Sequence, residues 1–425
     1  MRLWLFLRFW SVLWHLGLPI LLVYLWNRGR KDPLYSQRLS ERFGRYRDGH
    51  RGAVWVHAVS LGEVRSAVPL IRALLDRGER VLTTHFTPAG RREAERVFAS
   101  DIAKGRLAAV WVPIETAWAY RGFFRAFRPK LGLVMEIEIW PRMILASRRA
   151  GVPLFMCNAQ YPTKSMARDA KSGIRHKMMQ ATAGAFVKSD LQARRFASVG
   201  VRNIRVTGEL RFDQPIPEVQ LQAARVLRPM LLARKVIALA SITEPEEGLF
   251  LDVIQTLTSA PEPPVVILIP RAPERFGPVA DALAARGLAA VRRSVLLTET
   301  LGLKEPSLPL ASGSVLLGDS LGEMYFYLTL ADRVVVGGGF QPKGSHNIIE
   351  PLALGKPVIV GPVIDTIEYP AVEAIAAGVC LQSKGETLAS DIQTWPEPQP
   401  EAIVGFIAAH SGAGARTMAA IAPLL

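Results

Sequence analysis

The chain has 425 residues, of which 49% are hydrophobic, and a formal net charge of +15. This length and apolar content exclude a disordered chain and predict about two globular domains with buried cores. The two cysteines, Cys157 and Cys380, lie far apart and match no metal-ligand spacing, which excludes a disulfide-stapled secreted domain.

The N-terminal region contains an uncharged apolar segment, FWSVLWHLGLPILLVYLW, at residues 9–26. Its length approaches the ~20 residues that cross a bilayer as a helix, so residues 1–31 are predicted to form a spanning membrane anchor. Arg28, Arg30 and Lys31 follow at once, and the positive-inside rule then places the remaining chain in the cytoplasm. A helix lying in the membrane interface is the alternative, and it also attaches the protein to a membrane.

Basic residues dominate the first 51 positions, where ten Lys or Arg stand against three Asp or Glu. Beside a membrane segment, such residues face anionic lipid headgroups, and each contributes about 1 kcal/mol to binding. Nucleic acid is not expected as a partner, because the chain has no recognition motif and its basic residues are not interleaved with aromatic ones.

Beyond residue 51, short apolar runs alternate with helical patterns. The runs are continuous rather than alternating, which predicts buried parallel strands. They lie at 54–58, 80–86, 107–113, 131–138, 152–158 and 184–189, and again at 235–241, 264–270, 288–294, 314–319, 333–339 and 357–362. This pattern predicts an α/β protein with two doubly wound domains and a cleft between them. We expect the domains at 32–215 and 234–425, joined by a proline-rich linker at 216–233.

The second domain contains the stretch GGGFQPKGSHNIIEPLALGKPVIVGP at 337–362. A strand leads into three glycines and a loop through Gly344, and a helix is predicted to begin near residues 345–346. Glycines let a ligand approach the backbone closely, and a helix N-terminus favours phosphate. Glu350, one turn beyond His346 on the same helix face, could accept hydrogen bonds from two ribose hydroxyls. The stretch therefore predicts a nucleotide site; a glycine turn that serves packing alone is the alternative.

The nucleotide is not expected to be held as in dinucleotide-binding proteins or NTPases. The chain contains no G-x-G-x-x-G after its first strand and no G-x-x-x-x-G-K-[ST]. It also contains no Asp-x-Asp that could present a divalent metal ion to a diphosphate. A nucleotide-sugar donor bound without metal is the favoured interpretation.

Two acidic stretches in the first domain are candidates for catalysis. In HAVSLGEV, Glu63 is expected in the first turn of a helix, whose dipole would stabilise its charged form and suit a general base. An ordinary first-turn glutamate is the alternative. In MEIEIWP, Glu136 and Glu138 are expected to point to one face at the end of a buried strand, where carboxylates need partners or a catalytic role. Salt bridges to neighbouring arginines are the alternative.

Five stretches, HAVSLGE, MEIEIWP, GELRFD, LGDSLGEM and GSHNIIEPLALGKPVIVGP, follow ERFGRY and the apolar segment in that order. Together they resemble the 3-deoxy-D-manno-octulosonic acid (Kdo) transferases of lipopolysaccharide synthesis. The resemblance implies a GT-B fold and an inverting transfer of Kdo from CMP-Kdo to a lipid A precursor. It places the reaction at the cytoplasmic face of the bacterial inner membrane and implies no metal ion or other cofactor.

The resemblance also implies roles for individual residues. Glu63 matches the general base and Glu136 a second essential acidic residue. The donor-binding residues are expected to be Gly318, Gly322, Glu323, Gly344, His346, Asn347 and Glu350. Arg271 is expected to hold the leaving phosphate in a bidentate way, and Lys164 and Arg168 to dock an acidic glycolipid acceptor.

Three positions depart from the usual family pattern. Thr243 and Ala272 stand where histidines are usual, and Gln160 where an arginine is usual. A transferase with another sugar donor or acceptor, and a nucleotide-binding paralogue without catalytic activity, are therefore alternative interpretations.

Overall fold

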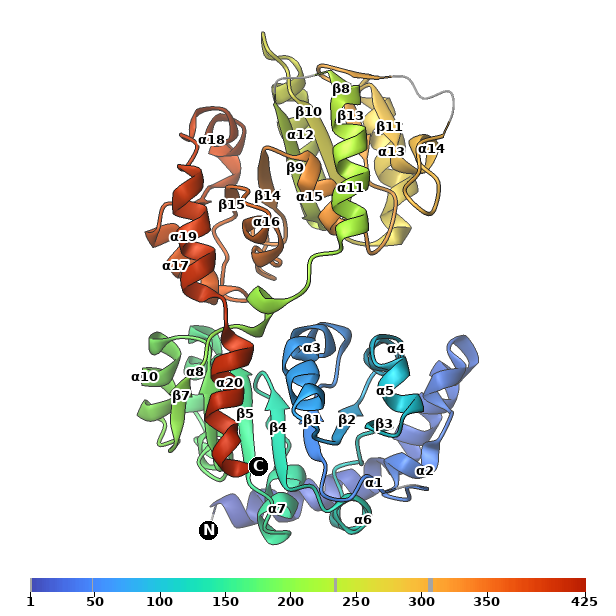
Figure 1. The fold of residues 1–425 in the computed structure, drawn as a ribbon, viewed down its shortest axis with the longest axis vertical. Helices are drawn as coiled ribbons and strands as arrows, with labels where there is room; N and C mark the ends of the chain where they lie inside the picture. The colour runs from blue at the N-terminus through green and yellow to red at the C-terminus, as the bar shows by residue number, and fades with distance from the viewer. Residues whose placement is uncertain (1, 48, 233–234, 305–308) are drawn as a thin grey trace. The chain divides into compact units, whose positions relative to one another are not determined.

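The computed structural model describes residues 2–47, 49–232, 235–304 and 309–425, and the chain divides into two compact units (Figure 1). The first unit comprises residues 1–214 and 410–425, and the second comprises residues 215–409.

The first unit is built on a parallel sheet of seven strands in the order β3-β2-β1-β4-β5-β6-β7. The strands are β1 (Val54–His57), β2 (Val81–His85), β3 (Leu107–Trp111), β4 (Leu131–Met135), β5 (Leu154–Ala159), β6 (Gly184–Val187) and β7 (Ile204–Val206). The six predicted strands of this domain are confirmed. The apolar pattern does not predict β7, because its three residues are largely exposed.

Helices cover both faces of this sheet. They are α3 (Leu61–Asp76), α4 (Pro88–Val97), α5 (Ala99–Ala103), α6 (Ala117–Phe127), α7 (Pro141–Arg149), α8 (Thr163–Ala170), α9 (Ile174–Met179), α10 (Asp190–Ser198) and α20 (Ala413–Ile421). Alternate strand residues face opposite sides. Val54 and Val56 pack into the core that includes α3, while Trp55 packs with Phe123 in the core that includes α6 and α7.

Four of the helices that follow strands of this sheet begin at Ser or Thr caps. Ser60, Thr87, Thr116 and Ser189 each accept a hydrogen bond from the backbone N–H three residues later. Such a cap satisfies one of the free N–H groups of a helix start and is worth about 1 kcal/mol. The caps therefore place the first turn of each helix directly after the preceding strand.

The second unit has a parallel sheet of seven strands in the order β11-β13-β10-β9-β14-β15-β16. These strands are β9 (Val236–Ile242), β10 (Val265–Pro270), β11 (Ala290–Arg292), β13 (Val315–Leu317), β14 (Arg333–Val336), β15 (Val358–Val360) and β16 (Cys380–Gln382). A short second sheet pairs β8 (Leu231–Leu232) with β12 (Leu310–Ala311). The six predicted strands are again confirmed, and β16 is an addition to the prediction.

Most helices of the second unit connect these parallel strands, while the first one precedes β9 and the last two follow β16. The helices are α11 (Glu218–Leu227), α12 (Glu247–Thr258), α13 (Phe276–Ala285), α14 (Arg293–Leu296), α15 (Met324–Leu330), α16 (Ile349–Ala353), α17 (Glu368–Ala376), α18 (Leu388–Thr394) and α19 (Pro400–His410).

The predicted end of the second domain at residue 425 is wrong, because α20 belongs to the first unit. Its residues Ala413, Ala420 and Ile421 are part of the same core as α3. The carboxylate of Asp213 also accepts hydrogen bonds from the N–H groups of Gly412 and Gly414, both at 2.6 Å. Apolar burial and these two bonds attach the C-terminal helix to the unit in which the chain begins.

The predicted linker at 216–233 is also wrong, because residues 215–232 belong to the second unit; residue 233 lies outside the described residues. Helix α11 packs on α15, and the side chain of Gln220 joins them. It donates to the carbonyl of Gly322 (2.8 Å) and accepts from the N–H of Phe326 (3.1 Å). Ala224 and Leu227 of α11 are fully buried. Pro215 and Pro217 precede this helix and Pro229 follows it, so the prolines flank the helix rather than replace it.

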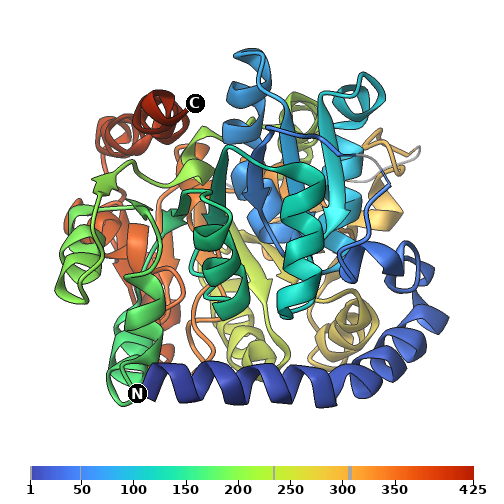
Figure 2. The ribbon, with the colours of Figure 1, turned by 90° about the horizontal axis from the view of Figure 1, so that it is seen from below.

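The chain begins with helix α1 (Arg2–Lys31), followed by the short helix α2 (Leu39–Arg42). Among the described residues, α1 is the one helix that is long and apolar enough to cross a membrane, with a mean hydropathy of 1.6 over an 18-residue window within Leu5–Lys31. Figure 2 shows α1 running along the first unit beside α6 and α7. Trp10 donates to Glu115 (3.1 Å), and Arg142 donates to the carbonyl of Leu7 (3.1 Å).

Candidate active site

In each sheet the strand order reverses at one point: between β1 and β4 in the first unit, and between β9 and β14 in the second. Ligands of doubly wound proteins bind beyond the carboxyl ends of the strands at such a point. The segments that follow these four strands are therefore the candidate site segments of the two units.

Glu63 follows β1 in the first turn of α3, as predicted. Its carboxylate folds back over the helix start and accepts hydrogen bonds from the N–H of Val59 (2.6 Å) and the hydroxyl of Ser60 (3.1 Å). Burial raises the pKa of Glu63 to about 7; the bond from Val59 opposes this rise, and the negative charges of Glu138 and Glu136 add to it.

The prediction that the helix dipole holds Glu63 in its charged form is wrong, because the loss of hydration outweighs the helix terminus. A carboxyl group with a pKa near 7 exists in both protonation states at neutral pH. Such a pKa suits a group that accepts a proton during a reaction and later releases it.

Glu136 lies just beyond the end of β4, with a φ of 57°. The prediction that strand alternation points Glu136 and Glu138 to one face therefore fails, because the strand ends at Met135. The carboxylate of Glu136 accepts hydrogen bonds from Lys188 (2.9 and 3.1 Å) and Asn158 (3.0 Å). The salt-bridge alternative thus describes Glu136, with a lysine as the close partner.

Lys188 binds a second carboxylate, that of the fully buried Glu209, at 2.7 Å. Asn158 also donates to Glu209 (2.8 Å), so the two acids share both partners. Burial raises the pKa of Glu209, but the charges of Lys188 and Arg211 outweigh this effect and lower it. The network holds Glu136 rigidly at the carboxyl edge of the sheet. The sequence signal for it was a lysine at the end of a buried strand, at residues 184–189.

Two histidines lie beneath this edge. His57 is fully buried, and its Nδ1 lies 2.8 Å from the hydroxyl of Thr84. Burial lowers the pKa of His57 to about 3 and that of His85 to about 4. Both rings are therefore neutral at physiological pH and cannot act as bases that cycle near neutrality. Trp140 packs edge-on against His57 and donates to Glu138 at 2.6 Å, which fixes the second acid of the MEIEIWP stretch.

The predicted acceptor-binding residues, Lys164 and Arg168, lie on α8, which follows β5. Arg168 forms an ion pair with Asp169 at 3.1 Å, although its side chain is 65% exposed. Gln160 immediately follows β5 at the same edge of the sheet.

The glycine stretch of the second unit follows β14. Gly338 has a φ of 89°, and a Cβ atom there would lie 2.6 Å from the carbonyl oxygen of Gly344 and 2.9 Å from the ring of His346. A Cβ on Gly344 would lie 2.8 Å from the hydroxyl of Thr366. Both glycines are therefore required by the close packing of the loop itself, whatever ligand the loop binds.

Glu246, which the sequence analysis did not single out, anchors this loop. Its carboxylate is fully buried and accepts hydrogen bonds from the N–H groups of Gly338 (2.8 Å) and Phe340 (3.1 Å). It also accepts the hydroxyl of Thr243 at 2.7 Å, in a capping box at the end of β9. The Thr-x-x-Glu spacing was the available sequence signal. The threonine at the usual histidine position thus has a structural role in this chain.

The predicted helix start near residues 345–346 is wrong, because α16 begins at Ile349. The side chain of Asn347 accepts the N–H of Ile349 at 3.0 Å, a local bond that competes with helix formation. His346 and Glu350 therefore do not share a helix face. Glu350 lies in the first turn of α16, near Tyr325, whose pKa is raised by burial and by the negative charge of Glu350.

His346 is held beside the glycine loop, and its Nε2 is buried without a hydrogen-bond partner among the described residues. Burial lowers the pKa of His346, and the positive charge of Arg271 lowers it further. Arg271 directly follows β10, and its N–H donates to the carbonyl of Ile242 at 2.8 Å. The ring is neutral, close to a cation, and offers one free nitrogen to a ligand.

The other predicted donor residues follow β13. A Cβ on Gly318 would lie 2.9 Å from the ring of Tyr327, and Gly322 has a φ of 79°. Glu323 forms an ion pair with Arg293 at 2.6 Å and accepts the hydroxyl of Ser320 at 2.5 Å. The sheet order places β13, β10, β9 and β14 side by side, so their carboxyl-end segments gather the predicted donor residues along one edge.

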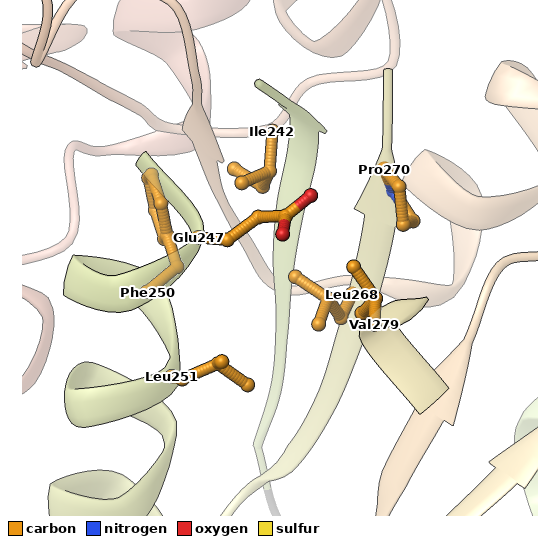
Figure 3. Close-up of a pocket in the computed structure, with 7 residues that line it drawn as sticks. All are labelled: Ile242, Glu247, Phe250, Leu251, Leu268, Pro270 and Val279. Carbon is orange, nitrogen blue, oxygen red and sulfur yellow. The ribbon is translucent and has the colours of Figure 1, made fainter. Parts of the chain in front are cut away.

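A small cavity lies deeper in the second unit, between β9, β10 and α12 (Figure 3). Its volume is about 10 Å³, which is room for at most one water molecule. The carboxylate of Glu247 reaches toward the strands there and is paired with Arg275 at 2.7 Å. The cavity is therefore a packing defect rather than a substrate site. No group of three or more potential metal-ligating side chains occurs in the described ranges.

Comparison with known proteins decides the family. The family model of 3-deoxy-D-manno-octulosonic-acid transferase matches residues 37–214. The 3-deoxy-D-manno-octulosonic acid transferase of Bordetella pertussis is 39% identical over an alignment of 425 positions, which covers 95% of this chain and 96% of that protein. The chain belongs to the Kdo transferase family. The Haemophilus influenzae transferase is 29% identical and covers 83% of this chain and 81% of its own.

The fold agrees with this family. The UDP-GlcNAc 2-epimerase of Neisseria meningitidis bound to UDP-GlcNAc, at 16% identity, has a TM-score of 0.55 over 85% of this chain and 95% of its own. The predicted GT-B type of fold, with two doubly wound units, is confirmed. As a Kdo transferase, the protein is a glycosyltransferase of lipopolysaccharide biosynthesis.

Proposed function

We propose that this Kdo transferase moves Kdo from CMP-Kdo to a hydroxyl of a lipid A precursor, lipid IVA, by an inverting and metal-independent reaction. The observation that carries the proposal is Glu63, a largely buried carboxyl group at the switch point of the first sheet with a pKa of about 7. Family membership supports the sugar.

In this mechanism Glu63 accepts the proton of the acceptor hydroxyl as the oxygen bonds to the anomeric carbon of the donor. The bond between that carbon and the phosphate oxygen breaks, and its electron pair leaves with CMP. Attack from the face opposite the leaving group inverts the configuration. Arg271 neutralises the departing phosphate, and the free nitrogen of His346 supplies a further hydrogen bond. Lys164 and Arg168 attract the acidic acceptor.

Glu350 is proposed to bind the ribose of the donor. We expect Glu350→Ala to weaken CMP binding by about 10- to 100-fold, since hydrogen bonds to a charged acceptor contribute ~1.5–3 kcal/mol. Isothermal titration calorimetry with CMP measures the loss, and Glu386→Ala, an exposed position of the same unit, is the control. Unchanged CMP affinity in the Glu350 variant contradicts the donor assignment. Tighter binding of UMP than of CMP by the parent favours a UDP-sugar donor instead.

We further propose that α1 lies in the cytoplasmic interface of the inner membrane rather than across it. Helix α1 contacts the first unit from Leu7 to Leu25, which is 3% exposed, so a spanning helix would have to give up these contacts. Most of its exposed side chains are apolar, although Arg8 and His15 are exposed as well. The exposed large hydrophobic residues of α1 are Leu5, Phe9, Val12, Leu13, Leu16, Ile20, Leu22, Val23, Tyr24 and Trp26. An interfacial helix buries such a face among the lipid headgroups and upper acyl chains.

A cysteine at position 2 distinguishes the two placements, because both native cysteines are buried. We expect a membrane-impermeant maleimide added to spheroplasts to leave Arg2→Cys unlabelled until the cells are lysed. A spanning α1 exposes this cysteine to the outside and gives labelling in intact spheroplasts, which contradicts the interfacial placement. Ser100→Cys, an exposed position of α5, is the cytoplasmic control.

A further inference from the structure

A pocket of about 220 Å³ lies between α6 and α7 in the first unit. It contains none of the residues assigned above to donor or acceptor, and α3 with Glu63 packs into the core on the other face of the sheet. The pocket is lined by Ala117, Arg121 and Phe124 of α6 and by Arg142, Leu145, Ala146, Arg149 and Ala150 at α7. Three arginine side chains thus line the pocket beside apolar residues; Arg121 and Arg149 are exposed, and Arg142 is half-buried.

The positive charge of this pocket is not balanced by the protein. In the part of the chain that the structure describes, Arg121, Arg142 and Arg149 form no ion pair. The nearby carboxylate of Glu115 is engaged at the start of α7, where it accepts the N–H groups of Arg142 (2.9 Å) and Met143 (3.0 Å). Burial also raises the pKa of Glu115, which disfavours its charged form. The three arginines therefore have no paired carboxylate among the described residues.

Arg142 lies close enough to two other arginines, Arg149 and Arg8, for their charges to act on it. Burial lowers its pKa, the charge of Glu115 opposes this, and the charges of Arg149 and Arg8 lower it further. Its Nε is buried without a hydrogen-bond partner among the described residues, while one terminal nitrogen donates to the carbonyl of Leu7 in α1. Arg142 thus connects the pocket to the helix whose exposed face is apolar.

The combination of arginines and an apolar wall selects an amphiphile with an anionic head. Guanidinium groups bind phosphate oxygens in a bidentate way. Phe124 and Leu145 offer contact to the first carbons of a lipid. The volume is below the ~300–1,000 Å³ of typical small-molecule sites, so it accommodates one phosphate headgroup but not a disaccharide acceptor.

We propose that the pocket between α6 and α7 is a headgroup site for an anionic glycerophospholipid, distinct from the acceptor site at Glu63. The inference rests on the proposed attachment of α1 to the membrane. A bound phospholipid would fix the first unit at a set depth and orientation on the bilayer.

The experiment uses the full-length protein in neutral detergent and titrates it with dihexanoyl phosphatidylglycerol as the probe. We expect the double variant Arg121→Gln/Arg149→Gln to bind this lipid about tenfold or more weakly than the parent. It keeps Arg142, and with it the bond to α1. The matched control is Arg125→Gln/Arg148→Gln, which removes the same charge from exposed positions of the same two helices. We expect the control to bind as the parent does.

Three results overturn the site. The first is that the pocket variant and the control variant bind the lipid probe with equal affinity, and the second is that the parent binds inorganic phosphate as tightly as it binds the probe. The third is that the lipid A precursor displaces the probe. Flotation with phosphatidylcholine vesicles separates this inference from the one on which it rests. A parent that fails to float even when phosphatidylglycerol is added to the vesicles contradicts both the membrane attachment and the site. A parent that floats, with the pocket and control variants responding alike to added phosphatidylglycerol, contradicts the headgroup site alone.

Discussion

We expect Glu63→Gln to lower kcat/KM for Kdo transfer by about 10²- to 10⁴-fold and to leave CMP affinity within about twofold of the parent. Glutamine keeps the shape of the side chain and can still accept the hydrogen bond of Val59, but it cannot take a proton from the acceptor. Mass spectrometry of the lipid product measures transfer, and calorimetry measures CMP binding. In the parent, kcat/KM should fall as the pH drops below about 7, where Glu63 becomes protonated.

The same substitution should change stability in a pH-dependent way. The pKa of Glu63 rises from 4.5 to about 7 on folding, so between these values the native state binds more protons than the unfolded state. Stability of the parent therefore falls as the pH rises from 4.5 to 7, in total by about 3 kcal/mol. Glutamine does not ionise and so avoids this loss of stability. Glu63→Gln should therefore melt at a higher temperature than the parent at pH 8 and at a similar temperature at pH 4.5.

Asp190→Asn is the matched control for Glu63. Asp190 occupies the first turn of α10 after the cap residue Ser189, so it has the same relation to a helix dipole without the proposed catalytic role. We expect full transfer activity from this variant. Normal turnover by Glu63→Gln, combined with a small loss of stability, would show that Glu63 only stabilises its helix.

We expect Glu246→Ala to abolish measurable CMP binding and to lower the free energy of unfolding by about 3 kcal/mol or more. Alanine leaves the N–H groups of Gly338 and Phe340 buried without their acceptor, and each such group costs ~1–3 kcal/mol. The hydroxyl of Thr243 loses its partner as well. Without the carboxylate, the glycine loop has no fixed position from which to bind the donor.

If the alanine variant is unfolded, Glu246→Gln still tests whether the glycine loop binds the donor. One amide oxygen can accept some of the N–H bonds, so this variant should remain folded below its melting temperature, yet bind CMP more weakly than the parent. Glu244→Gln in the same short turn is the control, because Glu244 is 68% exposed and its ion pair with Arg275 contributes at most about 1 kcal/mol. Parental CMP affinity in a folded Glu246→Gln protein would remove the glycine loop from the donor site.

The sequence by itself determined the class of fold and the family. Continuous apolar runs have one physical explanation in a chain of this composition, namely strands buried on both faces, and all twelve predicted runs form parallel strands. The short motifs are local as well. A cap such as Ser60 and a first-turn acid such as Glu63 act within three residues of each other, so their spacing alone predicts the helix start.

Only the tertiary structure decided which residues act together. The pKa of Glu63 depends on how much protein covers it. The partners of Glu136 come from β5 and from the segments after β6 and β7, up to 75 residues away in sequence. The start of α16 depended on one hydrogen bond, which the side chain of Asn347 accepts from the N–H of Ile349. This bond competes with an earlier start of the helix. The assignment of α20 to the first unit depends on its packing with α3 in one apolar core. Desolvation and long-range packing are properties of the assembled chain, and periodicity or spacing in the sequence carries no measure of either.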